Sequence, residues 1–470
     1  MTQTRFHALN IKTLIATACL GLFIGVQAEL NLEIPDTLTT VNGGSAVQSM
    51  PVNFSSVGLK RLRSVRRRST TVEDPELNAW IRGLGRKLQA QTSYANRPFY
   101  FVIVKDNDVN AYATQGGLIV INSGLILRSS SESELAAVMA HEVAHITQQH
   151  IERMIANSER NVFGNTAAVV AGLLVGSKDP AAGQAIVASA LAVDAHRGLS
   201  FSRSAETEAD REGLRILANA RFDPNGMTRF LRKLNDGVDP RYADISQYLT
   251  SHPLSSQRVN DVGQLALRYG KYQGKENISY AYMQEKLRVL TRSATSGGKP
   301  TTMVRRYGQA MQAFQQGNAT QATRLLAANT QQVPEASLLA KSYVQLRQYQ
   351  KALQILQPLV QRYPAEESLI LPYADALIGL KRTAEAWQVM GRIPLTEQTS
   401  LEFLESRQEI AQLAGKLGQA YLSIAERNIR IGEYRHALIQ LDQALKVQNN
   451  TPYERQQMQQ AIYRAKRFKK

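Results

Sequence analysis

The sequence predicts an α+β domain that is mostly helical with a small sheet, followed by an all-α solenoid of helix pairs. Two observations predict the first domain. His and Glu residues recur at helical spacing, and two short runs, 99–104 and 118–121, are rich in β-branched and aromatic residues. One observation predicts the second: alanines recur at intervals of 30 and 34 residues in the last third of the chain. The 470 residues also exceed what one hydrophobic core usually serves.

The pentapeptide HEVAH at residues 141–145 lies in a stretch that predicts one amphipathic helix from about Glu132 to His150. His141 and His145 would lie about one turn apart on the same face, so both imidazoles can bind one zinc ion. The carboxylate of Glu142 would lie beside the metal, where it can take a proton from water that the ion has acidified. That water can attack a peptide carbonyl. The pattern therefore indicates a zinc peptidase with one zinc ion per chain.

Local signals support this helix. Ser131 and Glu134 form an S-x-x-E capping box at its expected start. Apolar residues at helical spacing predict one buried stripe beside the metal face, formed by Leu135, Val138, Met139, Val143 and Ile146. The alternative interpretation is an ordinary surface pattern on a helix.

A second acidic segment, SRSAETEAD at residues 202–210, begins another predicted helix. Glu206 and Asp210 are four residues apart, so one carboxylate can complete the zinc triad while the other orients a ligand histidine through its free N–H. Glu208 is expected to point elsewhere. An acidic helix start can also merely complement the helix dipole, but the upstream H-E-x-x-H favours the metal site.

These motifs, with SHPLSSQR at residues 251–258, resemble the gluzincin metallopeptidases that include HtpX and the CAAX prenyl endopeptidases. The resemblance implies a zincin-like metallopeptidase domain. It implies that His141, His145 and Glu206 are the zinc ligands and that Glu142 is the general base.

The same resemblance implies three supporting residues. Asp210 would support a ligand histidine. His252 would lie near the open metal position, where it could stabilise the oxyanion or occupy the water site as a fourth ligand and keep the enzyme latent. Arg258 would lie close by as transition-state support. Residues 110–113 and 116–120 resemble the edge strand of that family.

Residues 1–28 have the features of a cleavable signal peptide. Arg5 and Lys12 precede an apolar run over residues 13–25, and a small-residue cleavage pattern follows the run. The run is short for a membrane span, which needs about 20 apolar residues. Cys19 is the only cysteine and lies inside the run, so lipidation is the alternative. We expect a periplasmic location, with which a mature chain without cysteine is compatible.

The chain is strongly basic, with a formal net charge of +17. A secreted chain rarely meets nucleic acid, so we expect no nucleic-acid partner; anionic lipid headgroups and acidic unfolded chains remain as partners for this charge. The densest basic run, residues 60–68, is interpreted as a solvated helix or loop face.

We expect a peptidase domain over residues 29–292, a polar linker over 293–302 and a repeat domain over 303–470. An insertion over 157–199 contains apolar runs about half as long as a membrane helix. It predicts a buried helical hairpin, with a cleft-covering flap or a peripheral membrane contact as the alternative.

Four alanines are expected to open the second helix of successive helix pairs, each followed four residues later by Leu or Met: Ala322, Ala352, Ala386 and Ala437. The first intervals match the tetratricopeptide period. The longer interval before Ala437 predicts an elongated helical connection around residues 401–417. The segment resembles an array of about four tetratricopeptide repeats, whose concave surface binds other proteins.

The order of leader, zinc peptidase and repeats resembles that of periplasmic proteases which act on outer-membrane β-barrel proteins. The resemblance implies unfolded or misassembled outer-membrane proteins as substrates, the β-barrel assembly machinery as a partner of the repeats, and a chaperone activity. The residues themselves support only endopeptidase chemistry joined to a protein-binding surface. The alternative is a non-proteolytic chaperone or scaffold whose zinc site is structural or latent.

Overall fold

The computed structural model describes residues 54–156, 202–236, 246–274, 277–294, 298, 300–326 and 332–469. The predicted leader and the insertion at 157–199 lie outside the described residues. Residues 52–470 form one compact unit. None of the helices in the described ranges is long and apolar enough to cross a membrane.

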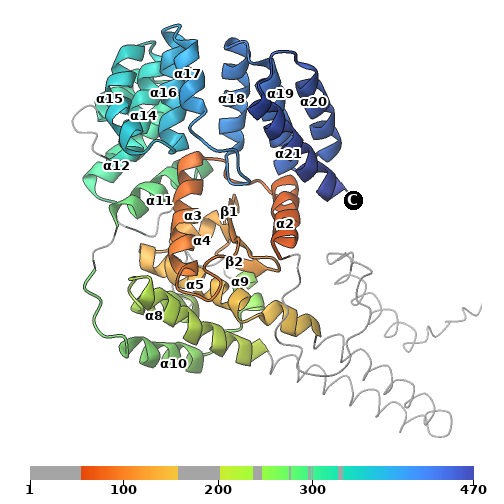
Figure 1. The fold of residues 1–470 in the computed structure, drawn as a ribbon. Coiled ribbons are helices and arrows are strands. Elements are labelled where there is room, and N and C mark those ends of the chain that lie inside the picture. Colours follow the sequence, from red (N-terminus) through yellow and green to blue (C-terminus); the bar gives the residue numbers. More distant parts are fainter. Residues whose placement is uncertain are drawn as a thin grey trace, which may run out of the picture. The chain divides into compact units, whose positions relative to one another are not determined.

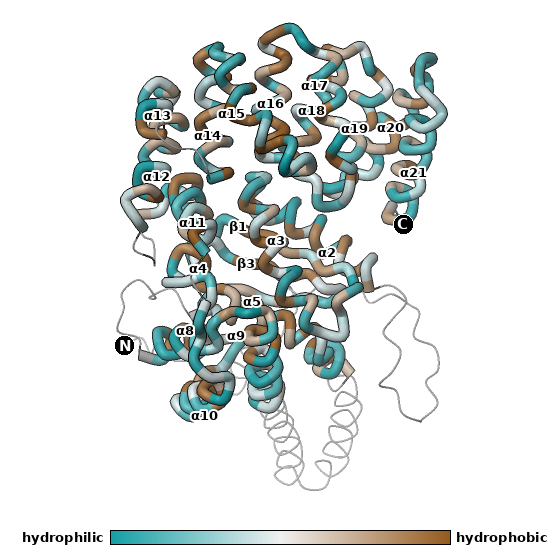
Figure 2. The backbone as a smooth tube through the Cα atoms, turned by 60° about the vertical axis from the view of Figure 1, so that its left-hand side comes forward, coloured by the Kyte–Doolittle hydropathy of each residue, from teal (hydrophilic) through white to brown (hydrophobic). Residues whose placement is uncertain are grey.

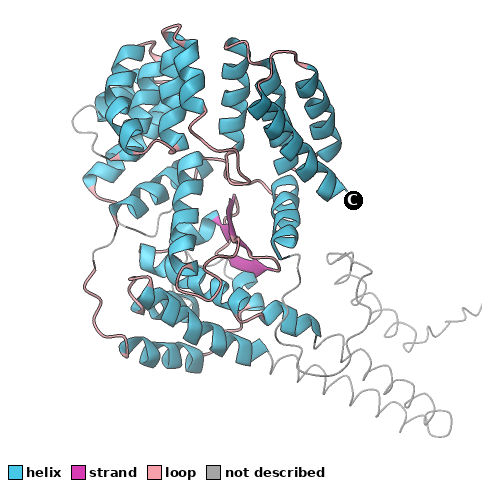
Figure 3. Cartoon of the chain, viewed as in Figure 1, coloured by secondary structure: helices cyan, strands magenta, loops and turns pink. Residues whose placement is uncertain are grey.

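The amino-terminal half contains a three-stranded sheet, drawn as arrows in Figure 1 and in magenta in Figure 3. Its strands are β1 (Tyr100–Val104), β2 (Ala111–Thr114) and β3 (Leu118–Asn122), in the order β1-β3-β2. β3 pairs parallel with β1 and antiparallel with β2. All residues of β1 and β3 are buried, as the apolar runs over 100–104 and 118–121 predict. The two predicted strands are confirmed. Of the two segments expected to resemble an edge strand, 110–113 corresponds to β2, which lies at an edge of the sheet. The expectation is wrong for 116–120, which leads into the central strand β3.

Helices surround this sheet. Those with defined bounds are α2 (Phe54–Arg68), α3 (Pro75–Gln89), α4 (Ser123–Arg128), α5 (Glu132–Thr147), α8 (Asn225–Asp236), α9 (Ser246–Ser251) and α10 (Ser256–Leu267). A further helix spans residues 202–219. The mixture of helices with a small sheet confirms the predicted fold class of this half.

α5 is the central helix of the domain. It begins as predicted, because the Ser131 hydroxyl accepts a hydrogen bond from the Glu134 backbone N–H at 3.2 Å. The predicted one-sided stripe is wrong, since every residue from Glu132 to Ile146 is buried. α5 packs against α3, α8 and β2, so all its faces are covered. It also ends earlier than His150, because Gln149 adopts a left-handed conformation with φ of 57°.

α2 rests directly on the turn between β2 and β3. A Cβ atom on Gly58 of α2 would lie 2.1 Å from the carbonyl oxygen of Gly116, so only glycine permits this approach. Gly116 itself has φ of 82°, which glycine adopts without strain. The helix and the turn therefore pack backbone against backbone.

The carboxy-terminal half is a stack of helices, confirming the predicted solenoid. Its helices are α12 (Thr302–Gln315), α13 (Ala319–Leu326), α14 (Val333–Gln345), α15 (Tyr349–Arg362), α16 (Glu367–Gly379), α17 (Thr383–Met390), α18 (Leu401–Leu413), α19 (Leu417–Arg430), α20 (Tyr434–Lys446) and α21 (Pro452–Lys469). Figure 2 shows hydrophobic and hydrophilic positions alternating along them, as amphipathic helices require.

The four predicted alanines each occupy the fourth position of a second helix, in α13, α15, α17 and α20, and each is completely buried. The long interval before Ala437 is filled differently from the prediction. α18 is a separate helix there, and the chain breaks at Gly415, where φ is 69°, before α19 begins. The interval therefore contains an extra packed helix and a turn.

α11 (Ile278–Thr291) joins the two halves. On one side, the Gln284 side chain donates to the Ser129 carbonyl at 2.8 Å. On the other, the Tyr282 hydroxyl donates to Glu335 Oε1 of α14 at 2.7 Å, and its ring meets that of Tyr307 edge-on at 5.2 Å. α11 precedes the linker expected at 293–302, so side chains from before that linker already contact the repeats.

Lys286 of α11 forms a buried ion cluster with α3. Its Nζ lies 2.8 Å from Asp74 Oδ2 and 2.7 Å from Glu76 Oε2. The two carboxylates outweigh the effect of burial and hold the pKa of Lys286 well above its usual value. The cluster fixes α11 against the peptidase half.

A second junction contains Arg63, which lies in the basic run of α2. The predicted solvated face is wrong at this position, because Arg63 is buried. Its Nη2 lies 2.6 Å from Glu397 Oε1, and its Nη1 donates to the Tyr434 hydroxyl at 3.1 Å. Its guanidinium lies 4.3 Å from the ring centre of Phe468 in α21. The end of the repeat array is therefore fastened to α2.

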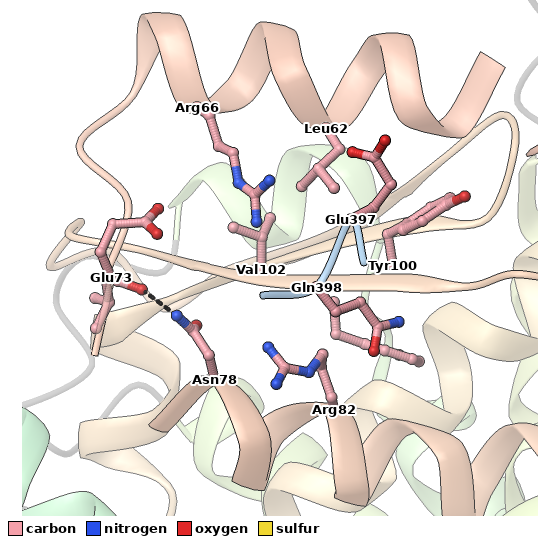
Figure 4. A pocket seen from close by; sticks show the side chains of 11 residues that line it. Leu62, Arg66, Glu73, Asn78, Arg82, Tyr100, Val102, Glu397 and Gln398 are labelled. Atoms are coloured by element: carbon pink, nitrogen blue, oxygen red, sulfur yellow. Dashed lines mark hydrogen bonds between the residues drawn. The ribbon is translucent and has the colours of Figure 1, made fainter. Parts of the chain in front are cut away.

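A small cavity of about 20 Å³ lies beside this junction, with room for about one water molecule. It is bounded by α2, α3, β1 and the loop that carries Glu397 and Gln398. Figure 4 shows Arg66 and Arg82 reaching toward it from α2 and α3. Two nitrogens of Arg66 are buried without a hydrogen-bond partner among the described residues. Burial correspondingly lowers the pKa of Arg66.

Candidate metal centre

Four side chains from three segments meet in the peptidase half. His141 and His145 come from α5, Glu206 from the helix at 202–219, and His252 follows α9 directly. One nitrogen or oxygen atom from each lies within 4.8 Å of the others. All four residues are buried. The structure thus brings together the three predicted ligands and the predicted fourth group.

The three predicted ligands point their lone-pair atoms at one another. Nε2 of His145 lies 3.0 Å from Nε2 of His141. The carboxylate of Glu206 lies 3.3 Å from both of these nitrogens. Two imidazoles and one carboxylate are the donor set of many catalytic zinc sites. A buried cluster of converging acceptors needs a cation or a shared proton, so these residues fit a divalent metal ion.

The electrostatics of the cluster also favour a positive charge. Burial opposes protonation of His141, but the carboxylates of Glu206 and Asp210 overcome it and raise the pKa to about 10. Despite its own burial, the pKa of Glu206 is lowered, chiefly by His141. Burial lowers the pKa of His145 to about 3. The negative field that retains a proton on His141 would equally attract a metal cation.

Glu142, the second residue of the motif, points toward the cluster. Its Oε2 accepts a hydrogen bond from the backbone N–H of Ala113 on β2 at 2.9 Å. Its Oε1 is buried and lies 3.3 Å from Nε2 of His252, without the geometry of a hydrogen bond. Burial raises the pKa of the Glu142 carboxyl. A raised pKa suits a group that takes up and releases a proton near neutral pH.

His252 lies between the ligands and Glu142. Its Nδ1 is 3.3 Å from Nε2 of His141 and 3.1 Å from Oε1 of Glu206. Tyr248 holds it in place, since its ring lies 4.8 Å from the imidazole and its carbonyl accepts the His252 backbone N–H at 2.8 Å. The imidazole therefore lies between the three predicted ligands and the carboxylate of Glu142.

Asp210 and Arg258 form a buried support behind this cluster. Oδ1 of Asp210 lies 3.0 Å from Nδ1 of His141. Arg258 donates to both oxygens of Asp210, at 2.6 and 2.8 Å, and its Nη1 lies 2.8 Å from Oε2 of Glu206. The nitrogens of Arg258 are thus directed at these two carboxylates and hold them in place.

Sequence reasoning missed three residues of the site. Tyr248 carries no motif. His150 was placed at the end of α5 without a role, and Glu208 was expected to point elsewhere. In the structure, Nδ1 of His150 lies 2.9 Å from Nδ1 of His145, and its Nε2 lies 3.1 Å from Oε2 of Glu208. The available sequence signal was the position of Glu208 between two other carboxylates in the acidic segment 202–210.

Comparison with known families agrees with this geometry. Residues 75–266, which contain all the site residues, match the model of peptidase family M48. This part of the chain therefore resembles a metallopeptidase of that family. Residues 343–410 match a tetratricopeptide repeat model, in agreement with the helix pairs. The family implies a divalent metal, and the His and Glu cluster provides the place for it.

A curated relative resembles the chain over both halves. The beta-barrel assembly-enhancing protease of Yersinia pestis is 28% identical over 91% of this chain and 95% of the relative. The protein of that name from Escherichia coli is 33% identical over 53% of this chain and 51% of the relative. A Vibrio cholerae relative is 35% identical over 53% of this chain and 50% of the relative. The chain thus spans about half the length of the last two relatives.

Proposed function

We propose that this protein is a zinc-dependent endopeptidase. One observation carries the proposal: Glu142 projects beside three buried metal-ligand side chains, and the edge strand β2 fixes its orientation. A zinc ion in this site would supply Lewis acidity, polarising a peptide carbonyl and acidifying water. His141, His145 and Glu206 would hold it, and Glu142 would accept the proton of the attacking water.

Substrate would bind along β2. It is an edge strand of the sheet, so its outward backbone groups can pair with an extended peptide whatever the side chains of that peptide are. Among the hydrogen bonds described for β2, one joins an outward group to the proposed base: the Ala113 N–H donates to Glu142. A peptide added beside β2 would pass next to Glu142. This arrangement suits a peptidase with broad sequence tolerance.

We further propose that the described conformation is latent. His252 fills the position beside the ligands, and every group of the cluster is buried. Cleavage therefore requires His252 to move away from Glu142. A closed shell of four protein groups also fits the alternative function, a chaperone or scaffold with a structural zinc ion, because structural sites leave no open position.

For the cellular role, we propose quality control and assembly of outer-membrane β-barrel proteins in the periplasm. The support is the printed name of the relatives and the helical repeats, which offer a surface for other proteins. Unfolded or misassembled barrel proteins would be the substrates, and the repeats would bind the barrel assembly machinery. A chaperone activity and a peripheral membrane contact belong to the same proposal.

The test compares Glu142→Gln with the wild-type full-length chain. Gln removes the base but no proposed ligand, so zinc content should stay at one ion per chain while cleavage of an unfolded β-barrel protein falls by about 10²- to 10⁴-fold. Glu212→Gln, on the helix that carries Glu206, is the matched control and should cleave normally. Undiminished cleavage by Glu142→Gln would refute the mechanism.

A second measurement separates the enzyme from the scaffold. Zinc content is determined for His252→Ala. Three remaining ligands retain zinc in a catalytic site, whereas a structural site that needs His252 loses it. Loss of zinc from this variant, together with an inactive wild type, would favour the scaffold.

A further inference from the structure

His145 is held by another histidine. Its Nε2 faces His141 and Glu206, so this nitrogen must keep its lone pair free if His145 is to bind a cation. The hydrogen of the neutral ring is then on Nδ1, which lies 2.9 Å from Nδ1 of His150. Since one of these two nitrogens must accept, His145 donates and His150 accepts.

The tautomer of His150 is set in turn by Glu208. With its Nδ1 accepting, His150 carries its hydrogen on Nε2, and this atom lies 3.1 Å from Oε2 of Glu208. A carboxylate only accepts, so the direction of the whole chain of hydrogen bonds is fixed. Nη2 of Arg153 donates to the same oxygen at 2.8 Å and holds the carboxylate in place.

His141 is supported in a similar way, but without an intervening histidine. His141 meets Asp210 directly, and Arg258 holds Asp210. Both supporting carboxylates come from the helix at 202–219, which also provides Glu206. The two sets of supporting side chains differ in their exposure to solvent. The side chains of Asp210 and Arg258 are 6% and 9% exposed, whereas those of Glu208 and Arg153 are 40% and 41% exposed.

The backbone places His150 in this role. In a continuous helix, residues five positions apart are separated by about 140° around the axis, so His150 and His145 would face different directions. The left-handed conformation of Gln149 ends α5 and turns the chain before the next helix begins. The break brings the buried ring of His150 back toward His145, and the two ring centres lie 4.8 Å apart.

We propose that His150 is a positioning residue for the metal ligand His145, with Glu208 fixing its tautomer and Arg153 fixing Glu208. His150 itself touches neither the metal position nor the base in the described contacts. This inference rests on the proposed zinc site and adds a residue that determines how tightly the site holds its ion.

The experiment measures zinc affinity of the full-length chain by competition with a chromophoric chelator. His150→Leu removes the acceptor for His145 and should weaken zinc binding by about 10- to 100-fold. His150→Asn places its side-chain oxygen where Nδ1 of His150 lies, so it can still accept from His145. It should restore affinity to near the wild-type value.

Two further variants address the outer link. Glu208 is partly exposed, so its replacement does not threaten the fold. Glu208→Leu should weaken zinc binding several-fold, while Glu212→Leu, which breaks an ion pair with Arg215 on the same helix, should not. Visible absorption of the Co²⁺-loaded proteins gives a second readout. The ligand-field bands should shift in His150→Leu and return in His150→Asn.

Wild-type affinity in His150→Leu would overturn the inference, and so would an equal loss in His150→Leu and His150→Asn, which would indicate packing alone. If His150→Leu does not fold, Glu208→Leu decides, and an unchanged affinity in that variant overturns the inference. A wild-type chain that binds no zinc refutes the proposed function instead, so the two failures are distinct.

Discussion

The backbone N–H of Ala113 donates to Oε2 of Glu142 at 2.9 Å, so the edge strand of the sheet orients the proposed general base. Strand and base are 29 residues apart in the chain. In the antiparallel pairing with β3, the backbone groups of alternate residues on β2 point outward, and Ala113 is one of these. The surface that would receive a peptide therefore also positions the group that would cleave it.

Replacing Ala113 with proline should impair the base without removing a ladder hydrogen bond. Proline has no N–H, and it is tolerated on an edge strand where that N–H points away from the sheet. We expect kcat to fall on the order of 10²-fold, because a misplaced catalytic group loses its alignment. Ala113→Gly keeps the N–H and serves as the control. Equal activity of the two variants would show that this hydrogen bond is unimportant.

Replacing His252 with alanine should raise the basal rate of proteolysis. The imidazole lies 3.3 Å from Glu142 and next to all three proposed ligands, so its removal opens the position that water and substrate need. Cleavage of an unfolded β-barrel protein is measured at equal zinc content. A lower rate than wild type would assign His252 a role in stabilising the transition state instead.

Replacing Arg63 with alanine should destabilise the junction between α2 and the last repeat. It removes the partner of Glu397 and the cation that stacks on Phe468. Loss of one member of a buried ion pair costs about 3 kcal/mol of unfolding free energy. Urea unfolding of the full-length chain measures it. Arg63→Lys keeps the charge and should lose less, whereas an unchanged midpoint in Arg63→Ala would mean that the junction contributes nothing to stability.

Periodic features of the fold could be predicted from the sequence. The runs that became β1 and β3 were identified by their side chains, and the alanines of the repeats by their spacing, because these patterns reflect burial on a repeating geometry. The break in the long interval before Ala437 was not predicted. It depends on a single left-handed residue, Gly415, which has no periodic signal.

The grouping of the site residues was also accessible from the sequence, because fixed spacing on a helix brings His141, His145 and Glu142 to one place. The role of His150 could not be predicted, because it depends on a break in the helix. Helical spacing directs it away from His145, and only the backbone conformation of Gln149 reverses that direction. Arg63 was misjudged because charge density in a sequence does not report which arginine finds an acidic and aromatic partner elsewhere in the chain.

The position of α11 bears on how such a protein could be recombined in evolution. A Cβ atom on Gly308 of α12 would lie 1.8 Å from Oε1 of Glu285, so α11 and α12 fit each other closely. Lys286 on the same helix is committed to Asp74 and Glu76 of the peptidase half. If other repeats were fused at the polar segment after α11, their first helix would have to pack against α11. The surface of α11 fits Gly308 of the present α12. A chimera that exchanges the repeats should therefore keep α11 together with its partners in both halves.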